Sequence, residues 1–186
     1  MLNNHENLQN RINKMKFRKI KVAAFTFILP FLLFAQDEAA PLIKKLKYVQ
    51  GVEKVDLLNE ISGLYRKSDR FLALDYARQA YTLSNKTNYL SGKALAKKNE
   101  GICWFFVGNN DSASICYNHS LEIYTQIKDK KGMSACYNNL GLIAQETGKY
   151  ALALKLYQQS IDIDIKLGDM IGAALTIENM AAINMY

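Results

Sequence analysis

The sequence is poor in the residues that interrupt helices. Only two prolines occur among its 186 residues, Pro30 and Pro41, so no proline follows residue 41. Proline breaks helix interiors, and the rest of the chain therefore lacks the strongest signal against long helices. No period-two alternation of the kind that marks strands is visible either. These two absences favour an all-α fold.

The residue clusters that support metal binding and catalysis are also missing. The chain has only two histidines, His5 and His119, and its three cysteines, at positions 103, 116 and 136, show no CxxC spacing. No metal site or cofactor is expected from such a set. There is no acid pair, Ser/His/Asp set or glycine-rich phosphate loop, so the protein is not expected to be an enzyme. The cysteines are interpreted as small core residues, with one disulfide as the alternative, and His119 is expected on a solvated face.

A basic surface is missing from most of the chain, although the formal net charge is +7. Residues 1–35 hold six Lys or Arg and one acidic residue, whereas residues 36–186 hold 18 Lys or Arg and 16 Asp or Glu. The two parts thus carry net charges of +5 and +2. A nucleic-acid partner is not expected, because the excess charge belongs to the N-terminal leader.

That leader has the layout of a secretory signal peptide. The cationic stretch "KFRKIK" (16–21) precedes the uncharged "VAAFTFILPFLLF" (22–34), and a small residue, Ala35, follows. The apolar stretch is shorter than the roughly 20 residues of a spanning helix, and it contains Pro30. We therefore expect a signal peptide over 1–35, cleaved after Ala35, and an exported protein in the periplasm or at the cell surface. An uncleaved membrane anchor is the alternative, and the true start is either Met1 or Met15.

The chain beyond the leader repeats itself at a fixed interval. Residues 146–163 read "ETGKYALALKLYQQSIDI", and forty positions earlier residues 106–123 read "FVGNNDSASICYNHSLEI". Five of these 18 positions are identical: Gly108/Gly148, Ala113/Ala153, Tyr117/Tyr157, Ser120/Ser160 and Ile123/Ile163. A period of 20–50 residues indicates a solenoid or array. The predicted units are 52–92, 93–132, 133–172 and a partial 173–186, preceded by a short capping segment over 36–51.

Each unit divides into two amphipathic stretches with helical spacing. In the third unit, Tyr137, Leu140 and Ala144 form one apolar stripe, and Tyr150, Ala153 and Tyr157 form another. Gly148 between them suits the left-handed conformation that ends a helix. We expect antiparallel helices of 14–18 residues joined by short turns. Ser68 and Asp69 in the first unit, and Asn110 and Asp111 in the second, are expected to cap the incoming helix. Small residues at Gly101/Gly141 predict sites where two helices approach closely.

These residues resemble a tetratricopeptide repeat (TPR). The third unit carries the pattern at Tyr137, Leu140, Gly141, Ala144, Gly148, Tyr150, Ala153, Tyr157 and Ser160, and the second unit at Gly101, Trp104, Gly108, Ala113, Tyr117 and Ser120. The chain departs from the familiar TPR in its 40-residue period, instead of 34, and in lacking the final proline. HEAT-type packing is an alternative at this period. The resemblance implies a right-handed superhelical solenoid of antiparallel helix pairs.

The resemblance also implies a function, because TPR arrays are scaffolds that bind peptides or protein segments in a concave groove lined by the first helix of each unit. Carried over position by position, the groove residues are Lys98, Asn99, Ile102, Phe105, Asn138, Asn139, Leu142, Gln145, Glu178 and Asn179. The ladder of Asn99, Asn139 and Asn179 suits an extended peptide, because a carboxamide both donates and accepts hydrogen bonds. The alternative is that these asparagines connect neighbouring helices.

A second hypothesis assigns the chain to a larger signalling protein. Exported 40-residue TPR arrays resemble the sensor regions of some histidine kinases, cyclases and transcriptional regulators, which would make residues 1–186 an N-terminal extracytoplasmic sensor region truncated at residue 186. The last stretch, "AALTIENMAAINMY" (173–186), is apolar and lacks a partner helix. We therefore expect Met180, Ile183 and Tyr186 to be exposed unless the chain continues or two copies pair through this open end.

Overall fold

The computed structural model describes residues 38–183, so the predicted signal peptide and Tyr186 lie outside the described residues. The described part is all helical. A short helix spans residues 38–45. It is followed by α2 (Gly51–Tyr65), α3 (Arg70–Lys86), α4 (Leu90–Phe106), α5 (Asn110–Gln126), α6 (Lys130–Glu146), α7 (Tyr150–Leu167) and α8 (Met170–Ile183). Their lengths, from 14 to 18 residues, confirm the expected range.

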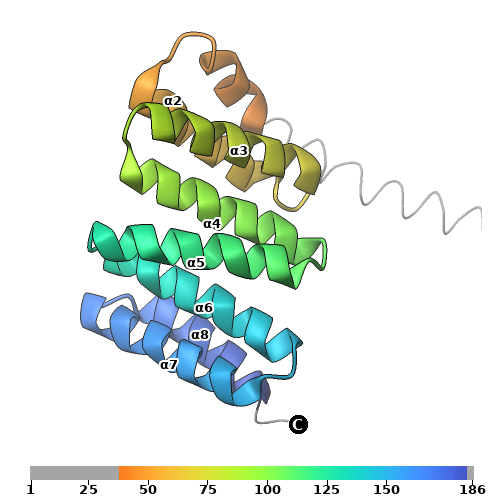
Figure 1. The fold of residues 1–186 in the computed structure, drawn as a ribbon, viewed down its shortest axis with the longest axis vertical. Coiled ribbons are helices and arrows are strands. Elements are labelled where there is room, and N and C mark those ends of the chain that lie inside the picture. The colour runs from red at the N-terminus through yellow and green to blue at the C-terminus, as the bar shows by residue number, and fades with distance from the viewer. Residues whose placement is uncertain (1–37, 184–186) are drawn as a thin grey trace, which may run out of the picture.

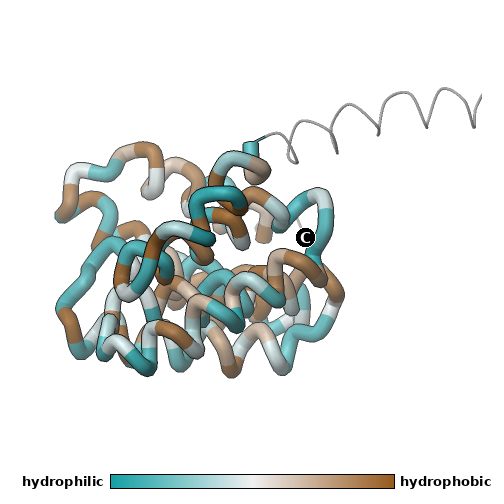
Figure 2. The backbone as a smooth tube through the Cα atoms, turned by 90° about the horizontal axis from the view of Figure 1, so that it is seen from above, coloured by the Kyte–Doolittle hydropathy of each residue, from teal (hydrophilic) through white to brown (hydrophobic). Residues whose placement is uncertain are grey.

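The helices from α2 to α6 follow one another along the long axis, and α8 lies against α7 at the C-terminal end (Figure 1). Each helix packs against the next, and the first helices of successive pairs, α2, α4, α6 and α8, also touch one another. This arrangement confirms the predicted all-α solenoid of antiparallel helix pairs. Seen along the stack, brown hydrophobic and teal hydrophilic residues are interspersed along the helices, as helices with one buried face require (Figure 2).

The turns recur with half the period of the repeat. Residues with positive φ occur at positions twenty residues apart: Asn88, Gly108, Lys128, Gly148 and Gly168. At Gly148, with φ of 72°, the backbone N–H groups of Gly148 and Lys149 donate to the carbonyls of Gln145 and Ala144. The predicted left-handed helix end at Gly148 is confirmed, and Lys128 takes the same conformation without the freedom of glycine.

Two glycines allow the helices of a pair to approach closely, as the sequence predicts. A Cβ added at Gly101 would lie 2.6 Å from the ring of Tyr117, and one at Gly141 would lie 2.5 Å from the ring of Tyr157. Both tyrosines are almost fully buried. The Gly/Tyr pairs therefore set the spacing of α4 against α5 and of α6 against α7.

The helix starts are capped by side chains that the sequence predicts only in part. Asp69 accepts hydrogen bonds from the backbone N–H groups of Phe71 and Leu72, which matches the expected cap at Ser68 and Asp69. In the next pair the cap is Asn109, which accepts from the N–H of Ser112. The sequence pointed to Asn110 and Asp111, which are instead the first residues of α5.

The two ends of the stack are covered differently. At the N-terminal end, Ala39 and Val49 are buried against α2 and α3. At the C-terminal end, the expectation of an exposed Met180 and Ile183 is wrong, because both pack with Ala144, Ala153 and Tyr157. The exposed apolar residues of α8 are those on its other side: Met170, Ile171, Leu175 and Ile177.

Candidate peptide-binding face

The candidate face is carried by the first helices of the repeats, and it includes a buried asparagine on α2 that the sequence did not predict. Asn59 on α2 lies forty residues before Asn99 on α4, and both are buried. The amide of Asn99 donates to the backbone oxygen of Asn59 at 3.2 Å, and the amide of Asn59 donates to the carbonyl of Gly92 at 3.0 Å. Asn99 therefore joins α2 to α4. Because α2 begins 39 residues before α4, Asn59 occupies the position of Lys98 and Asn138, and the asparagine shared with Asn138 was the signal that would have found it.

The other ladder asparagines differ from Asn99 and from each other. Asn179 on α8 donates to the side-chain oxygen of Asn138 on α6 at 3.0 Å. Asn139 is half-buried and has no side-chain hydrogen bond with another residue of the 38–183 range. Of the three positions that are equivalent in sequence, Asn99 and Asn179 thus join neighbouring helices, and Asn139 keeps a carboxamide without a hydrogen bond in the described range.

Lys98 is the cation of this face. It is half-buried on α4 and forms no ion pair within the part of the chain that the structure describes. Burial lowers its pKa, and the positive charges of Arg66 and Lys131 act in the same direction, opposed by Cys136 and Asp129. A bound anion would stabilise the charged form of such a desolvated ammonium group, because the ion pair compensates for the lost contacts with water.

The remaining predicted residues are divided between packing and solvent. Ile102 and Phe105 pack against a cluster from α5 and α6, and Leu142 packs against one from α6 and α7. The side-chain oxygen of Gln145 accepts a hydrogen bond from the hydroxyl of Tyr157 at 2.7 Å. Glu178 is exposed on α8. The face therefore offers half-buried apolar side chains beside the Lys98 ammonium and the Asn139 amide.

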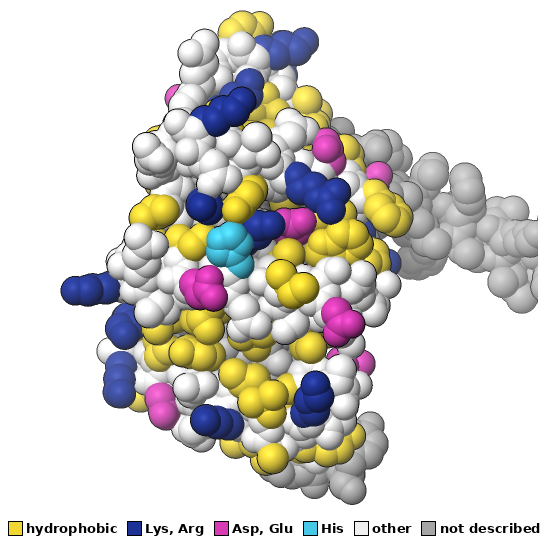
Figure 3. Space-filling model, viewed as in Figure 1, with side chains coloured by type: hydrophobic (Ala, Val, Ile, Leu, Met, Phe, Trp, Pro, Cys, Tyr) yellow, Lys and Arg dark blue, Asp and Glu magenta, His cyan; other side chains and the backbone are white. Residues whose placement is uncertain are grey.

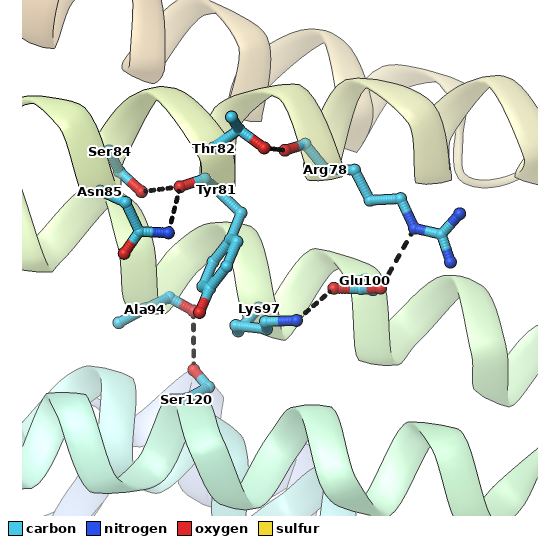
Figure 4. Close-up of polar contacts among 9 residues, drawn as sticks. All are labelled: Arg78, Tyr81, Thr82, Ser84, Asn85, Ala94, Lys97, Glu100 and Ser120. Atoms are coloured by element: carbon cyan, nitrogen blue, oxygen red, sulfur yellow. Dashed lines mark hydrogen bonds and ion pairs between the residues drawn. The ribbon is translucent and has the colours of Figure 1, made fainter.

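A polar network that the sequence did not indicate lies between α3 and α4 (Figure 4). Glu100 is buried, and its two oxygens pair with Arg78 at 3.3 Å and Lys97 at 2.7 Å. Burial alone would raise the pKa of Glu100, but these two cations together lower it. The ammonium of Lys97 also lies 4.3 Å from the ring centre of Tyr81. A buried carboxylate with two partners ties the two repeats together.

The metal-ligating residue types of the described part do not cluster, and its cysteines lie in the core. No group of three or more His, Cys, Asp or Glu within residues 38–183 could hold a metal ion. The cysteines are free thiols in the core, as expected for small core residues, and burial raises the pKa of Cys103 and Cys116 to about 11. His119 is half-buried rather than solvated, with its ring edge-on to Tyr81. In the same range, the helices lack the length and hydrophobicity of a membrane span.

Comparisons with known proteins agree with this geometry. Residues 93–166 match the family model described as tetratricopeptide repeat. A search of curated proteins gave no match. The fold is similar to that of a Rap protein complexed with competence and sporulation factor, with a TM-score of 0.74 and 19% identity over 86% of this chain and 45% of that chain.

Two further solved structures share the architecture. Aspartyl phosphate phosphatase F from Bacillus subtilis has a TM-score of 0.61 at 17% identity, covering 82% of this chain and 45% of its own. The "Podosopora anserina putative kinesin light chain nearly identical TPR-like repeats" have a TM-score of 0.57 at 13% identity, covering 86% and 92%. This chain thus spans less than half the length of the Rap protein and of the phosphatase. The family match over residues 93–166 and the shared fold show a TPR-like helical solenoid.

Proposed function

We propose that this protein is an exported TPR scaffold that binds a peptide or protein segment on the face formed by α4, α6 and α8. The observation that carries the proposal is the half-buried ammonium of Lys98, which has no ion pair within residues 38–183, beside half-buried apolar side chains. The similar Rap protein, which is complexed with competence and sporulation factor, supports a ligand-binding role for this fold. On this proposal, Lys98 pairs with a carboxylate of the ligand, and Asn139 bonds the ligand backbone.

The test selects a ligand and then removes these two groups. A phage-displayed library of random peptides is selected on purified residues 36–186, and the affinity of a selected peptide is measured by fluorescence anisotropy. Lys98→Met and Asn139→Ala are expected to weaken binding by at least about tenfold each. The matched control is Asn118→Ala on the exposed side of α5, which is expected to bind normally. Unchanged binding by both variants contradicts the proposal.

Export is the second part of the proposal, and the charge and hydrophobicity of residues 16–35 support it. We expect the mature protein to begin near Gln36 and to be recovered outside the cytoplasm. Cell fractionation followed by N-terminal sequencing tests this. An intact residue 15 on the exported protein supports an uncleaved anchor, and recovery from the cytoplasm alone contradicts export.

A second candidate function is the extracytoplasmic sensor region of a larger signalling protein, such as a histidine kinase, cyclase or transcriptional regulator. The open side of α8 favours it. The equivalent positions Ala94 and Ser134 are buried under the helix that follows, whereas Ala174 is exposed. A further repeat would cover this side. The reading frame after Tyr186 tests the idea, since a spanning segment followed by an output domain is expected.

Self-association is the other proposal for the same surface. Two copies that pair through Met170, Ile171 and Leu175 would remove three exposed apolar side chains from water. Light scattering of residues 36–186 is expected to show dimers, and Leu175→Glu is expected to give monomers. A wild-type protein that stays monomeric at high concentration contradicts the proposal.

A further inference from the structure

The outer side of α3, α4 and α5 exposes large apolar side chains. At its edge the ring centre of Phe106 lies 6.1 Å from that of Phe105, a residue of the candidate peptide-binding face. Phe71 on α3 is 74% exposed, Ile115 on α5 is 70% exposed, and Phe106 at the end of α4 is 46% exposed. Hydrophobic and basic side chains gather over these helices in the space-filling view (Figure 3). Exposed apolar groups that cluster, rather than being scattered, are typical of interaction surfaces.

The repeat does not require apolar residues at these places. The other units carry charged residues or alanine forty positions away: Asp111 and Ala151 for Phe71, Asp75 and Lys155 for Ile115, and Glu146 for Phe106. Each of these alternatives occupies the same place in a helix that folds and packs in the same way. Phe71, Phe106 and Ile115 are therefore not explained by the architecture of the solenoid.

Two arginines lie over aromatic rings in the same region. The guanidinium carbon of Arg70 lies 5.6 Å from the ring centre of Phe106, and that of Arg78 lies 5.6 Å from the ring centre of Trp104. Arg78 uses its Nε to pair with Glu100, while its side chain remains 55% exposed. Its terminal nitrogens point away from Glu100 in the close-up (Figure 4). Both guanidinium groups thus lie over an aromatic ring, and each has N–H groups that can donate hydrogen bonds to a ligand.

Trp104, over whose ring Arg78 lies, anchors this region to the core. It is half-buried and packs against both the α2–α3 core and the α4–α6 core. Ile115 lies one helical turn before His119, whose ring meets Tyr81, and Tyr81 lies one turn after Arg78. We call the six residues that form this surface the outer patch: Arg70, Phe71, Arg78, Trp104, Phe106 and Ile115.

We infer that the outer patch binds a segment of a partner protein in which apolar side chains are flanked by carboxylates. Charge complementarity selects this occupant. The patch contributes two arginines. Two carboxylates of the same helices have partners: Glu100 is only 9% exposed and holds two cations, and Asp75 accepts a hydrogen bond from Gln79, while Asp111 is exposed one turn before Ile115. Tryptophan and arginine are also the residue types that dominate binding energy at protein interfaces. The inference adds a second binding surface to the proposed function.

Trp104 provides a direct readout, because it is the single tryptophan of the chain. The probes are synthetic peptides in which Leu or Phe alternates with Glu or Asp, and matched peptides in which Lys replaces every acidic residue. We expect the acidic peptides to shift the emission of Trp104 and to bind more weakly at high salt. The lysine peptides are expected to leave the emission unchanged. No shift with any acidic peptide, or an equal shift with the lysine peptides, overturns the inference.

Two double variants locate the binding. Phe71→Ser with Ile115→Ser removes the most exposed apolar side chains of the patch and is expected to weaken binding by at least about tenfold. Tyr150→Ser with Leu152→Ser removes two residues of α7 that are 45% and 46% exposed, and is expected to have no effect. Circular dichroism checks that both variants stay folded. Wild-type affinity in the patch variant overturns the inference.

Two further measurements distinguish the patch from other sites. Lys98→Met is expected to reduce binding on the candidate peptide-binding face while leaving the acidic peptides bound to the outer patch. If Lys98→Met abolishes binding of the acidic peptides, they occupy the other face and the inference is wrong. Vesicles of phosphatidylserine are expected to leave Trp104 emission unchanged. A shift with vesicles but not with peptides assigns the patch to a membrane surface and overturns the protein partner.

Discussion

Replacing Gly141 with alanine tests whether the close approach of α6 and α7 is required. The new methyl carbon would lie 2.5 Å from Cε1 and 2.6 Å from Cδ1 of Tyr157. Carbon atoms in contact are normally about 3.5–4.0 Å apart, so the two groups must separate by roughly 1 Å. The substitution therefore forces either the ring or the helix to move.

The tyrosine ring has little room to move. Tyr157 is fully buried, its hydroxyl donates to Gln145, and it packs with Ala153 and Ile183. Inserting a methyl group into a well-packed core costs about 1–3 kcal/mol. Alanine favours the helix over glycine by about 1 kcal/mol, which offsets part of this cost. Because the clash falls on a ring that is held on all sides, we expect a net destabilisation of about 1–2 kcal/mol.

Gly63 provides the matched control, because it also lies inside a helix. A Cβ added there would have no atom within 4 Å. Gly63→Ala is therefore expected to stabilise the protein by about 0.5–1 kcal/mol through the helix preference alone. Urea unfolding of both variants, followed by circular dichroism at one protein concentration, measures the difference. Equal stability of the two variants would refute the packing argument.

A double-mutant cycle separates the steric clash from other effects. Tyr157→Leu removes the ring, at a cost of its own, and leaves space beside position 141. Adding Gly141→Ala to that variant is expected to be neutral or stabilising, which gives a coupling of about 1 kcal/mol or more between the two positions. The same destabilisation by Gly141→Ala with and without the ring would assign the effect to the backbone.

Lys128→Gly is expected to raise the free energy of unfolding by about 1 kcal/mol, because residue 128 has a φ of 58°, which disfavours residues with a side chain. The control Lys130→Gly places glycine in a helix and is expected to lower the free energy of unfolding, and urea unfolding measures both changes. The low pKa of Glu100 means that its ion pairs stabilise the fold above the unfolded-state pKa and are lost as pH falls through the folded one. Glu100→Gln should therefore lower the free energy of unfolding at pH 7 and reduce its further decrease below about pH 4.5. Glu122→Gln on the exposed side of α5 should change neither quantity, and urea unfolding at a series of pH values measures both. With buried thiols whose pKa is about 11 for Cys103 and Cys116, a disulfide reagent at pH 8 should label the unfolded but not the native protein. Rapid labelling of the native protein would show that the cysteines are accessible.

The periodic features of this protein are determined by local sequence. The forty-residue interval, the glycines at 101 and 141 and the turn at Gly148 predict helix pairs, a close approach and a left-handed helix end, and all three are present. Such features depend on helix spacing and on residues within one or two units, which are all visible in the sequence. The stripe of apolar residues along each helix predicts which face of that helix is buried.

The individual roles of side chains are decided by the tertiary structure. Asn99, Asn139 and Asn179 are equivalent in sequence, yet one is buried against Asn59, one is open and one bonds Asn138. The sequence assigned Met180 and Ile183 to solvent, whereas the packing of α8 on α6 and α7 buries Ile183 and partly buries Met180. The outer patch joins residues of three helices that no local pattern connects. The spacing of residues along a helix predicts on which face of the helix a side chain lies. The distance and crossing angle of the neighbouring helix determine which residues that side chain contacts.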